Sequence, residues 1–183
     1  MRYGPPGDLI SKCYREVHGA EITRSFDRFL VGSSDAGTTA ALGYRRAEHG
    51  PLFLEHYLAE PVEHAVSRAM GMTVERADIV ELGNFAAVSG PAMVELWGRA
   101  ANDLGTASLV AVATLTRSLR SMFTRIGMPI VELVEAKIEA IGGEGADWGR
   151  YYEQDPRVCA GSIPLGQAAL ARHFARRAAR VAA

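Results

Sequence analysis

One carboxylate stands inside an otherwise apolar stretch of the sequence. Glu81 lies in the segment Asp78 to Ala87, which reads DIVELGNFAA and is typical of a buried strand. A carboxylate in such surroundings must be paired, protonated or used in catalysis, because burying an unpaired charge is costly. Desolvation would raise its pKa towards the range in which a general base deprotonates an attacking ammonium group. The alternative is a structural ion pair with Arg68 or Arg76, and the sequence leaves both open.

Two further glutamates precede this segment and could share a pocket with it. Glu55 lies before the first clear helix and Glu63 lies in that helix's first turn. Together with Glu81 they could receive a cationic amine, with Glu63 as a second catalytic candidate and Glu55 as a substrate-binding residue. For Glu63 the helix dipole offers a structural explanation, since a carboxylate is favoured in the first turn.

Familiar catalytic and metal-binding motifs are absent. The sequence contains no GxxxxGK[ST] loop, no GxSxG elbow and no HExxH. Its five histidines lack ligand spacing, so we expect no metal site and no permanently bound cofactor. Cys13 and Cys159 form no CxxC pair, which favours a reduced compartment.

Length and composition indicate one globular domain. The 183 residues are 48% hydrophobic and 22% charged, and the formal net charge of −1 gives no reason to expect nucleic acid. No apolar run is long enough to span a membrane, and the first residues lack a secretory pattern. A cytoplasmic location is the default expectation. We divide residues 1–183 into a variable N-terminal part at 1–36, the body of the domain, and a basic C-terminal helix at 165–183.

The pattern of apolar residues predicts an α/β fold with a mixed sheet. Residues 38–46 read as a strand, and residues 51–58 as its hairpin partner. A short helix opens at Pro61 and closes at Gly71. Between residues 78 and 134 the pattern reads strand, helix, strand, helix, strand, which predicts parallel pairing with helical crossovers and helices on both faces.

Two families resemble this chain over its middle and end. The stretch VELGNFAAV at residues 80–88 is similar to the E-L-S-R-F strand of acyl-homoserine-lactone synthases, although Asn84 stands where those enzymes have arginine. Three blocks resemble the thermostable haemolysin family more closely: LFLEHYLAEPVE at 52–63, ELGN at 81–84 and WGRYYEQDPRVCAG at 148–161. Both resemblances imply a GNAT-like fold, and the synthases move an acyl group from a coenzyme A or carrier-protein thioester to an amine.

The resemblance implies a place for the acyl donor. Gly83 and Asn84 would mark a bulge that opens the strand for a pantetheine arm, with Asn84 as a further catalytic candidate, or they are a plain irregularity. The loop after that strand should bind the donor through backbone N–H groups. It lacks the full glycine pattern, and Pro91 removes one donor. The residues assigned to the donor are Phe85, Ala86, Ala87, Val88, Ser89, Gly90, Arg117 and Arg120.

Aromatic and basic residues complete the expected site. Tyr57, Trp148, Tyr151 and Tyr152 could wall the substrate pocket, or they pack in the core. Arginines in the helix after residue 116 and in the C-terminal helix could dock an acidic acyl carrier protein or an anionic membrane, or simply form solvated faces.

The sequence therefore favours an acyltransferase in which an amine of a small molecule attacks a thioester directly in a ternary complex. Glu81 would act as the base, and backbone N–H groups near Phe85 to Val88 would polarise the carbonyl. The alternatives are a membrane-active protein of the haemolysin type and a catalytically silent ligand-binding domain. The sequence does not indicate the oligomeric state.

Overall fold

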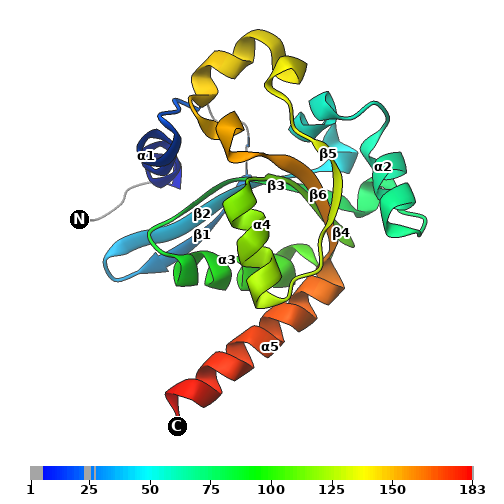
Figure 1. Cartoon of the computed structure of the whole chain (residues 1–183). Helices are drawn as coiled ribbons and strands as arrows, with labels where there is room; N and C mark the ends of the chain where they lie inside the picture. The colour runs from blue at the N-terminus through cyan, green and yellow to red at the C-terminus, as the bar shows by residue number, and fades with distance from the viewer. Residues whose placement is uncertain (1–5, 23–25, 27, 183) are drawn as a thin grey trace.

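The computed structural model describes residues 6–22, 26 and 28–182, and within them six strands form one mixed sheet (Figure 1). The order across the sheet is β1-β2-β3-β4-β6-β5. Only β3 and β4 pair in parallel; the other neighbours are antiparallel. The strands are β1 Arg28–Ser34, β2 Gly37–Arg46, β3 Ile79–Ala87, β4 Val110–Leu115, β5 Val131–Glu135 and β6 Arg157–Ser162. The predicted mixed sheet is confirmed.

Helices cover both faces of this sheet, as the sequence predicts. One face carries α1 Pro6–His18 and α2 Val62–Met70, together with the 3₁₀ helices η2 Phe53–Tyr57, η4 Ile138–Trp148 and η5 Tyr151–Gln154. The other face carries α3 Gly90–Leu104, α4 Arg117–Ile126 and α5 Ile163–Val181. Two shorter 3₁₀ turns, η1 Ala47–His49 and η3 Arg76–Asp78, flank the start of β3. Each face thus has its own hydrophobic core, separated by the sheet.

The helix boundaries follow the capping residues that the sequence provides. Ser89 accepts a hydrogen bond from the backbone N–H of Ala92 at the start of α3. Gly71 and Gly127 close α2 and α4 with φ of 66° and 79°, a left-handed conformation that glycine adopts without penalty. The predicted end of the short helix at Gly71 is therefore confirmed, and α5 covers most of the predicted C-terminal helix. Residues 1–5, 23–25 and 27 of the predicted N-terminal part, and Ala183, lie outside the described residues.

Two predicted pairings are wrong. Residues 51–58 are not the hairpin partner of β2, because η2 occupies most of this segment; the partner is β1. The backbone N–H of Leu52 donates to the side chain of Glu55, which turns the chain into a 3₁₀ helix. In addition, β5 does not pair with β4, since β6 returns from the C-terminal end and lies between them.

The two parallel strands at the centre of the sheet, β3 and β4, separate halfway along β3. Their pairing runs from Ile79 opposite Val110 to Leu82 opposite Ala113, and no further pair follows in the described residues. Beyond this point β3 continues to Ala87 alongside β2, while β4 continues alongside β6. The sheet is therefore split at its centre, and the split begins after Leu82, one residue beyond Glu81.

Candidate functional site

A bulge in β3 marks the split. The register between β2 and β3 shifts between Ala41 and Gly43, so that one more residue stands on β3 than on β2. Asn84 has a φ of 52°, which is unusual for a residue with a side chain. The backbone irregularity that the sequence indicates at Gly83 and Asn84 is present. Its consequence is that Glu81 lies on one face of the sheet and Phe85 packs in the core of the other face.

Glu81 is held by backbone N–H groups rather than by an arginine. Phe53 N–H donates to its Oε2 at 3.0 Å and Leu54 N–H donates to Oε1 at 2.9 Å. The residue is only 3% exposed, and burial raises the pKa of its carboxyl, while the two hydrogen bonds act in the opposite direction. Neither ion pair considered from the sequence forms, because Arg68 pairs with Glu60 and Arg76 with other carboxylates. Each oxygen of Glu81 keeps a second lone pair for a ligand.

Glu55 and Glu63 do not join Glu81 in one pocket. Arg76 lies between Glu55 and Glu63. It donates to both oxygens of Glu55 at 2.7 and 2.9 Å and to Glu63 at 3.0 Å. Glu55 also accepts from the backbone N–H groups of Leu52 and Val62. This cluster joins η2, α2 and η3. The structure therefore gives these two carboxylates a structural partner in place of the expected amine.

A small pocket of about 30 Å³ opens beside Glu81. Asn84 is 5% exposed there, and its side-chain amide has no hydrogen-bond partner among the described residues. The hydroxyl of Tyr57 lies 2.5 Å from that of Tyr152, so Tyr152 supports this wall without lining it. The full lining is Tyr14, Phe26, Phe53, Tyr57, Glu81, Leu82, Gly83, Asn84, Thr114, Trp148 and Tyr151. Aromatic rings around one carboxylate suit an ammonium group.

The ring of Phe26 forms part of this pocket and packs directly against the backbone of Gly43 and Gly83. A Cβ added at Gly83 would lie 2.7 Å from Cε2 and Cζ of Phe26, and one at Gly43 would lie 2.6 Å from its Cγ. Neither Phe26 nor Tyr14 was among the residues predicted for the site. The glycine inside the predicted strand was a signal for a close approach, but it did not identify the ring.

We expect Gly83→Ala to lower the free energy of unfolding by about 1–3 kcal/mol, because the added methyl group displaces the Phe26 ring from a packed site. Urea denaturation measures this. The matched control is Gly90→Ala, whose Cβ would meet only Met122 Cε at 3.9 Å and should leave stability within about 0.5 kcal/mol. Equal stability of the two variants would contradict the account of Phe26.

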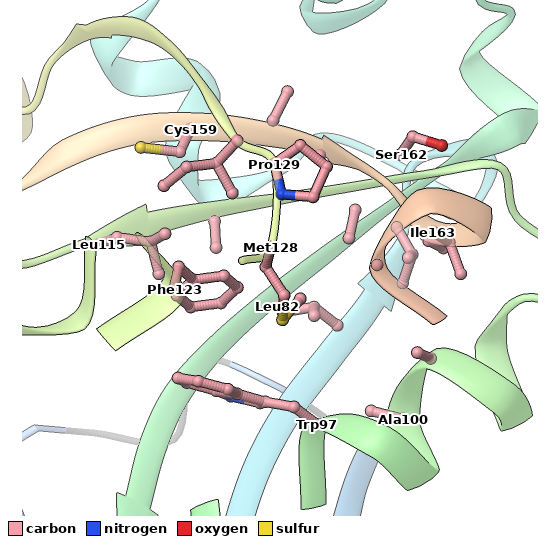
Figure 2. A pocket seen from close by; sticks show the side chains of 18 of the residues that line it. Leu82, Trp97, Ala100, Leu115, Phe123, Met128, Pro129, Cys159, Ser162 and Ile163 are labelled. Carbon is pink, nitrogen blue, oxygen red and sulfur yellow. The ribbon is translucent and has the colours of Figure 1, made fainter. Parts of the chain in front are cut away.

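On the other face of the sheet, beside the split, lies an apolar cavity of about 70 Å³ (Figure 2). Ala111, Ala113 and Leu115 of β4 line it, so it follows roughly 13 Å of that strand. Figure 2 shows Leu115 and Phe123 near one end, Ser162 and Ile163 near the other, and Trp97 and Ala100 of α3 below. Small side chains create the space: Ala100, Ala101, Ala111, Ala113, Ala160, Gly161 and Gly166 all belong to its lining.

Leu82 lines both the cavity and the pocket beside Glu81. The two spaces therefore lie on either side of Leu82, the last residue of β3 that pairs with β4. The cavity was not predicted from the sequence, because alanines and glycines spread over β4, β6, α3 and α5 carry no local pattern. Only Phe85 among the predicted donor-binding residues lines it.

The remaining predicted donor-binding residues lie along the end of β3 and the start of α3. Ala86 packs against α1 and Ala87 against α3. The N–H of Val88 already donates to Thr39 O, and Ser89 caps α3 ahead of Gly90. Arg117 is largely exposed. Arg120 is committed to the main chain of Leu115 and Asp155 and to the carboxylates of Asp155 and Glu132.

The described residues give no sign of a metal centre or a membrane span. No group of three or more histidine, cysteine, aspartate or glutamate side chains among them is placed to hold a metal ion. In the same part of the chain, no helix has the length and apolar character needed to cross a bilayer.

Solved structures with a similar fold include an acyl-homoserine-lactone synthase and an N-acyl amino acid synthase. TofI is 19% identical with a TM-score of 0.59, and the match covers 90% of this chain and 87% of TofI. The acyl-homoserine-lactone synthase LasI is 15% identical with a TM-score of 0.58, covering 88% and 83%. FeeM, an N-acyl amino acid synthase from uncultured soil microbes, is 13% identical with a TM-score of 0.56, covering 85% and 87%. These likenesses confirm the GNAT-like fold.

The sequence comparison adds the family. No curated protein matches the sequence. The family model described as "Thermostable hemolysin" matches residues 6–167, which include every strand, the pocket beside Glu81 and the cavity. The chain therefore belongs to the thermostable hemolysin family.

Proposed function

We propose that this protein is an N-acyltransferase, which transfers an acyl group from a coenzyme A or carrier-protein thioester to the amine of a small molecule. The observation that carries the proposal is the split between β3 and β4. An apolar cavity lies on one face of the sheet beside it and a carboxylate in an aromatic pocket lies on the other, with Leu82 on the wall of both. The apolar lining of the first space suits an acyl chain, and the carboxylate and aromatic rings of the second suit an ammonium group.

The reaction needs no protein nucleophile. The thioester carbonyl lies at the split, and the acceptor ammonium loses a proton to Glu81 before its nitrogen attacks the carbonyl carbon. The bulge takes Asn84 and Phe85 out of the regular ladder with β2, so their N–H groups are the candidates for binding the oxyanion. Collapse of the tetrahedral intermediate breaks the C–S bond, and the departing thiolate takes up the second proton that the nitrogen loses as the amide forms.

Solved structures with a similar fold support this proposal. BjaI, a coenzyme A-dependent acyl-homoserine-lactone synthase, was solved with SAM and isopentyl-coenzyme A, and FeeM is an N-acyl amino acid synthase. At 13–14% identity they support a shared fold, and extending their activity to this chain rests on the cavity and the pocket on either side of Leu82.

Native mass spectrometry of the purified protein with octanoyl-coenzyme A and octanoyl carrier protein tests the donor half. A retained thioester, followed by amide formation across a panel of small amines, supports the proposal. Retention without turnover would favour a silent ligand-binding domain instead. If neither donor binds, the proposal is wrong.

The cavity should set the length of the acyl chain. We expect Ala111→Leu to reduce kcat/KM for a decanoyl donor about tenfold or more, because the larger side chain fills space next to Gly161. Turnover of a butanoyl donor should change by less than about threefold, since a short chain stays near the split. Equal losses with both donors would show that this cavity does not hold the acyl chain.

A further inference from the structure

The proposed base, Glu81, is held from outside its own strand. Both of its donors, the N–H groups of Phe53 and Leu54, belong to η2, which lies 27 to 28 residues earlier in the chain. Main-chain donors stabilise a buried carboxylate only while they point at it, because a hydrogen bond weakens steeply away from linear geometry. The properties of Glu81 therefore depend on how η2 is held against β3.

The side chain of Glu55 holds the start of η2. Its carboxylate accepts from the backbone N–H of Leu52 at 2.8 Å and from that of Val62 at 3.3 Å, so it ties the residue before η2 to the first residue of α2. The two donor residues, Phe53 and Leu54, follow directly after Leu52. Glu55 thus fixes the direction in which their N–H groups point.

Arg76 connects this carboxylate to the strand that carries Glu81. It donates to the two oxygens of Glu55 at 2.7 and 2.9 Å, and it belongs to η3, which leads directly into β3. A bidentate pair of this kind holds both partners in one orientation. A continuous series of hydrogen bonds therefore runs from the start of β3 through Arg76, Glu55 and η2 back to Glu81.

We propose that Glu55, clamped by Arg76, is a positioning residue, which holds the two main-chain donors of η2 at Glu81 and so sets the pH at which this base becomes active. Neither Glu55 nor Arg76 is among the described residues that line the pocket beside Glu81, so their effect passes through η2. This inference rests on the proposed acyltransferase function and adds a residue that acts on its base.

The groups around Glu81 give the proposal a distinctive sign. Burial raises the pKa of Glu81, and the N–H groups of Leu54 and Phe53 lower it. Arg45, which stands opposite Glu81 on β2, also lowers this pKa, whereas the charge of Glu55 raises it. Loss of the charge of Glu55 alone would therefore lower the pKa of Glu81, while release of η2 would raise it. Three phenols from α1, η2 and η5 also line the pocket, and burial raises the pKa of each, so they stay uncharged: Tyr14, Tyr57 and Tyr151.

The test compares the pH dependence of kcat/KM for acyl transfer, which should rise with pH as Glu81 ionises. In Glu55→Ala we expect this rise to move to higher pH. At its foot kcat/KM should fall about tenfold more than on its plateau, because weakened N–H donors favour the protonated carboxyl. A move to lower pH would show that only the charge of Glu55 reaches Glu81. An unchanged position would show that Glu55 only supports the fold, and either result overturns the inference.

Carbon-13 NMR of the Glu81 carboxyl measures the same effect without turnover. The signal is assigned by its absence in Glu81→Gln, and its titration midpoint should be higher in Glu55→Ala than in the wild type. An equal or lower midpoint overturns the inference.

Glu63→Ala is the matched control, because Glu63 accepts from the same Arg76 at 3.0 Å but lies on α2 rather than η2. Its pH profile should match the wild type, with kcat/KM within about twofold. A shift as large as that in Glu55→Ala would assign the effect to a general loosening of the cluster and overturn the inference. Thermal melts check that every variant is folded.

Two conservative variants separate the position of Glu55 from its charge. Glu55→Gln keeps an oxygen that accepts from Leu52 N–H, so the rise should return towards its wild-type position. Glu55→Asp keeps the charge but is shorter by one methylene group, so it should move the rise in the same direction as Glu55→Ala. Glu55→Asp also carries the test if Glu55→Ala does not fold.

The inference and the proposed function fail in different ways. An unshifted profile in Glu55→Ala and Glu55→Asp, with acyl transfer by the wild type, overturns the positioning role and leaves the acyltransferase proposal standing. No acyl transfer by the wild type from octanoyl-coenzyme A or octanoyl carrier protein overturns both.

Discussion

Replacing Glu81 by glutamine should lower kcat/KM for acyl transfer by about 10²- to 10⁴-fold, the range typical for the loss of a general base. The carboxylate lies in the aromatic pocket with both oxygens held by backbone N–H groups, so it is fixed in position and able to take a proton. Glutamine keeps the size and one acceptor oxygen but has no basic site. Steady-state kinetics with a thioester and an acceptor amine measure the effect.

The pH profile separates a base from a residue that only supports the fold. Burial raises the pKa of Glu81, so its active, ionised form accumulates above the usual range for a carboxylate. The wild-type rate should therefore rise with pH through an apparent pKa higher than that of an exposed glutamate, and Glu81→Gln should lack this limb. A purely structural Glu81 would leave the shape of the profile unchanged.

Glu81→Gln also has an expected cost in stability, which needs its own control. The NH₂ of the glutamine would face the N–H of either Phe53 or Leu54, so that donor would lose its hydrogen bond. We expect this to lower the free energy of unfolding by about 1–3 kcal/mol. Assays well below the melting temperature remove this contribution. Glu153→Gln is an exposed counterpart that should leave both rate and stability within measurement error. A folded Glu81→Gln variant with wild-type turnover would rule out the base.

Local patterns in the sequence were sufficient for the parts of the fold that depend on local chemistry. The capping serine before α3 and the glycines after α2 and α4 act within a few residues of themselves. The unusual apolar setting of Glu81 was likewise visible in one short segment. The bulge at Asn84 could be predicted because a glycine interrupted an otherwise regular strand.

Features that depend on distant segments could not be predicted in the same way. The place of β6 between β4 and β5 is decided by a return of the chain from the C-terminal end. Glu81 finds its partners in η2, about 28 residues earlier, where the donors are main-chain groups that any residue type provides. The cavity depends on small residues from four elements that only the packed fold brings together.

Removing Arg76 should have the largest effect on stability. This side chain donates to both oxygens of Glu55, to Glu63, and to the carbonyls of Ala47 and Gly50. Its exposure is 30%, against 20% for Glu55 and 23% for Glu63, so the group is only partly solvated. Arg76→Met would leave two carboxylates close together without their cation. We expect the free energy of unfolding to fall by about 3 kcal/mol, measured by urea denaturation at neutral pH.

The same cluster should make the stability of the fold depend on pH in the acid range. The hydrogen bonds from Arg76 lower the pKa of Glu55 to about 2, against 4.5 for the free side chain. Because this pKa is lower in the folded state, the stabilisation is fully present above pH 4.5 and is lost as the pH falls from there towards 2. Arg76→Met should flatten this part of the stability curve. In the cycle with Glu55→Gln, the double variant should lose less than the sum of the single changes. Additive losses would show that the two side chains are not coupled, and that η2 is held in place beneath Glu81 by its main-chain contacts alone.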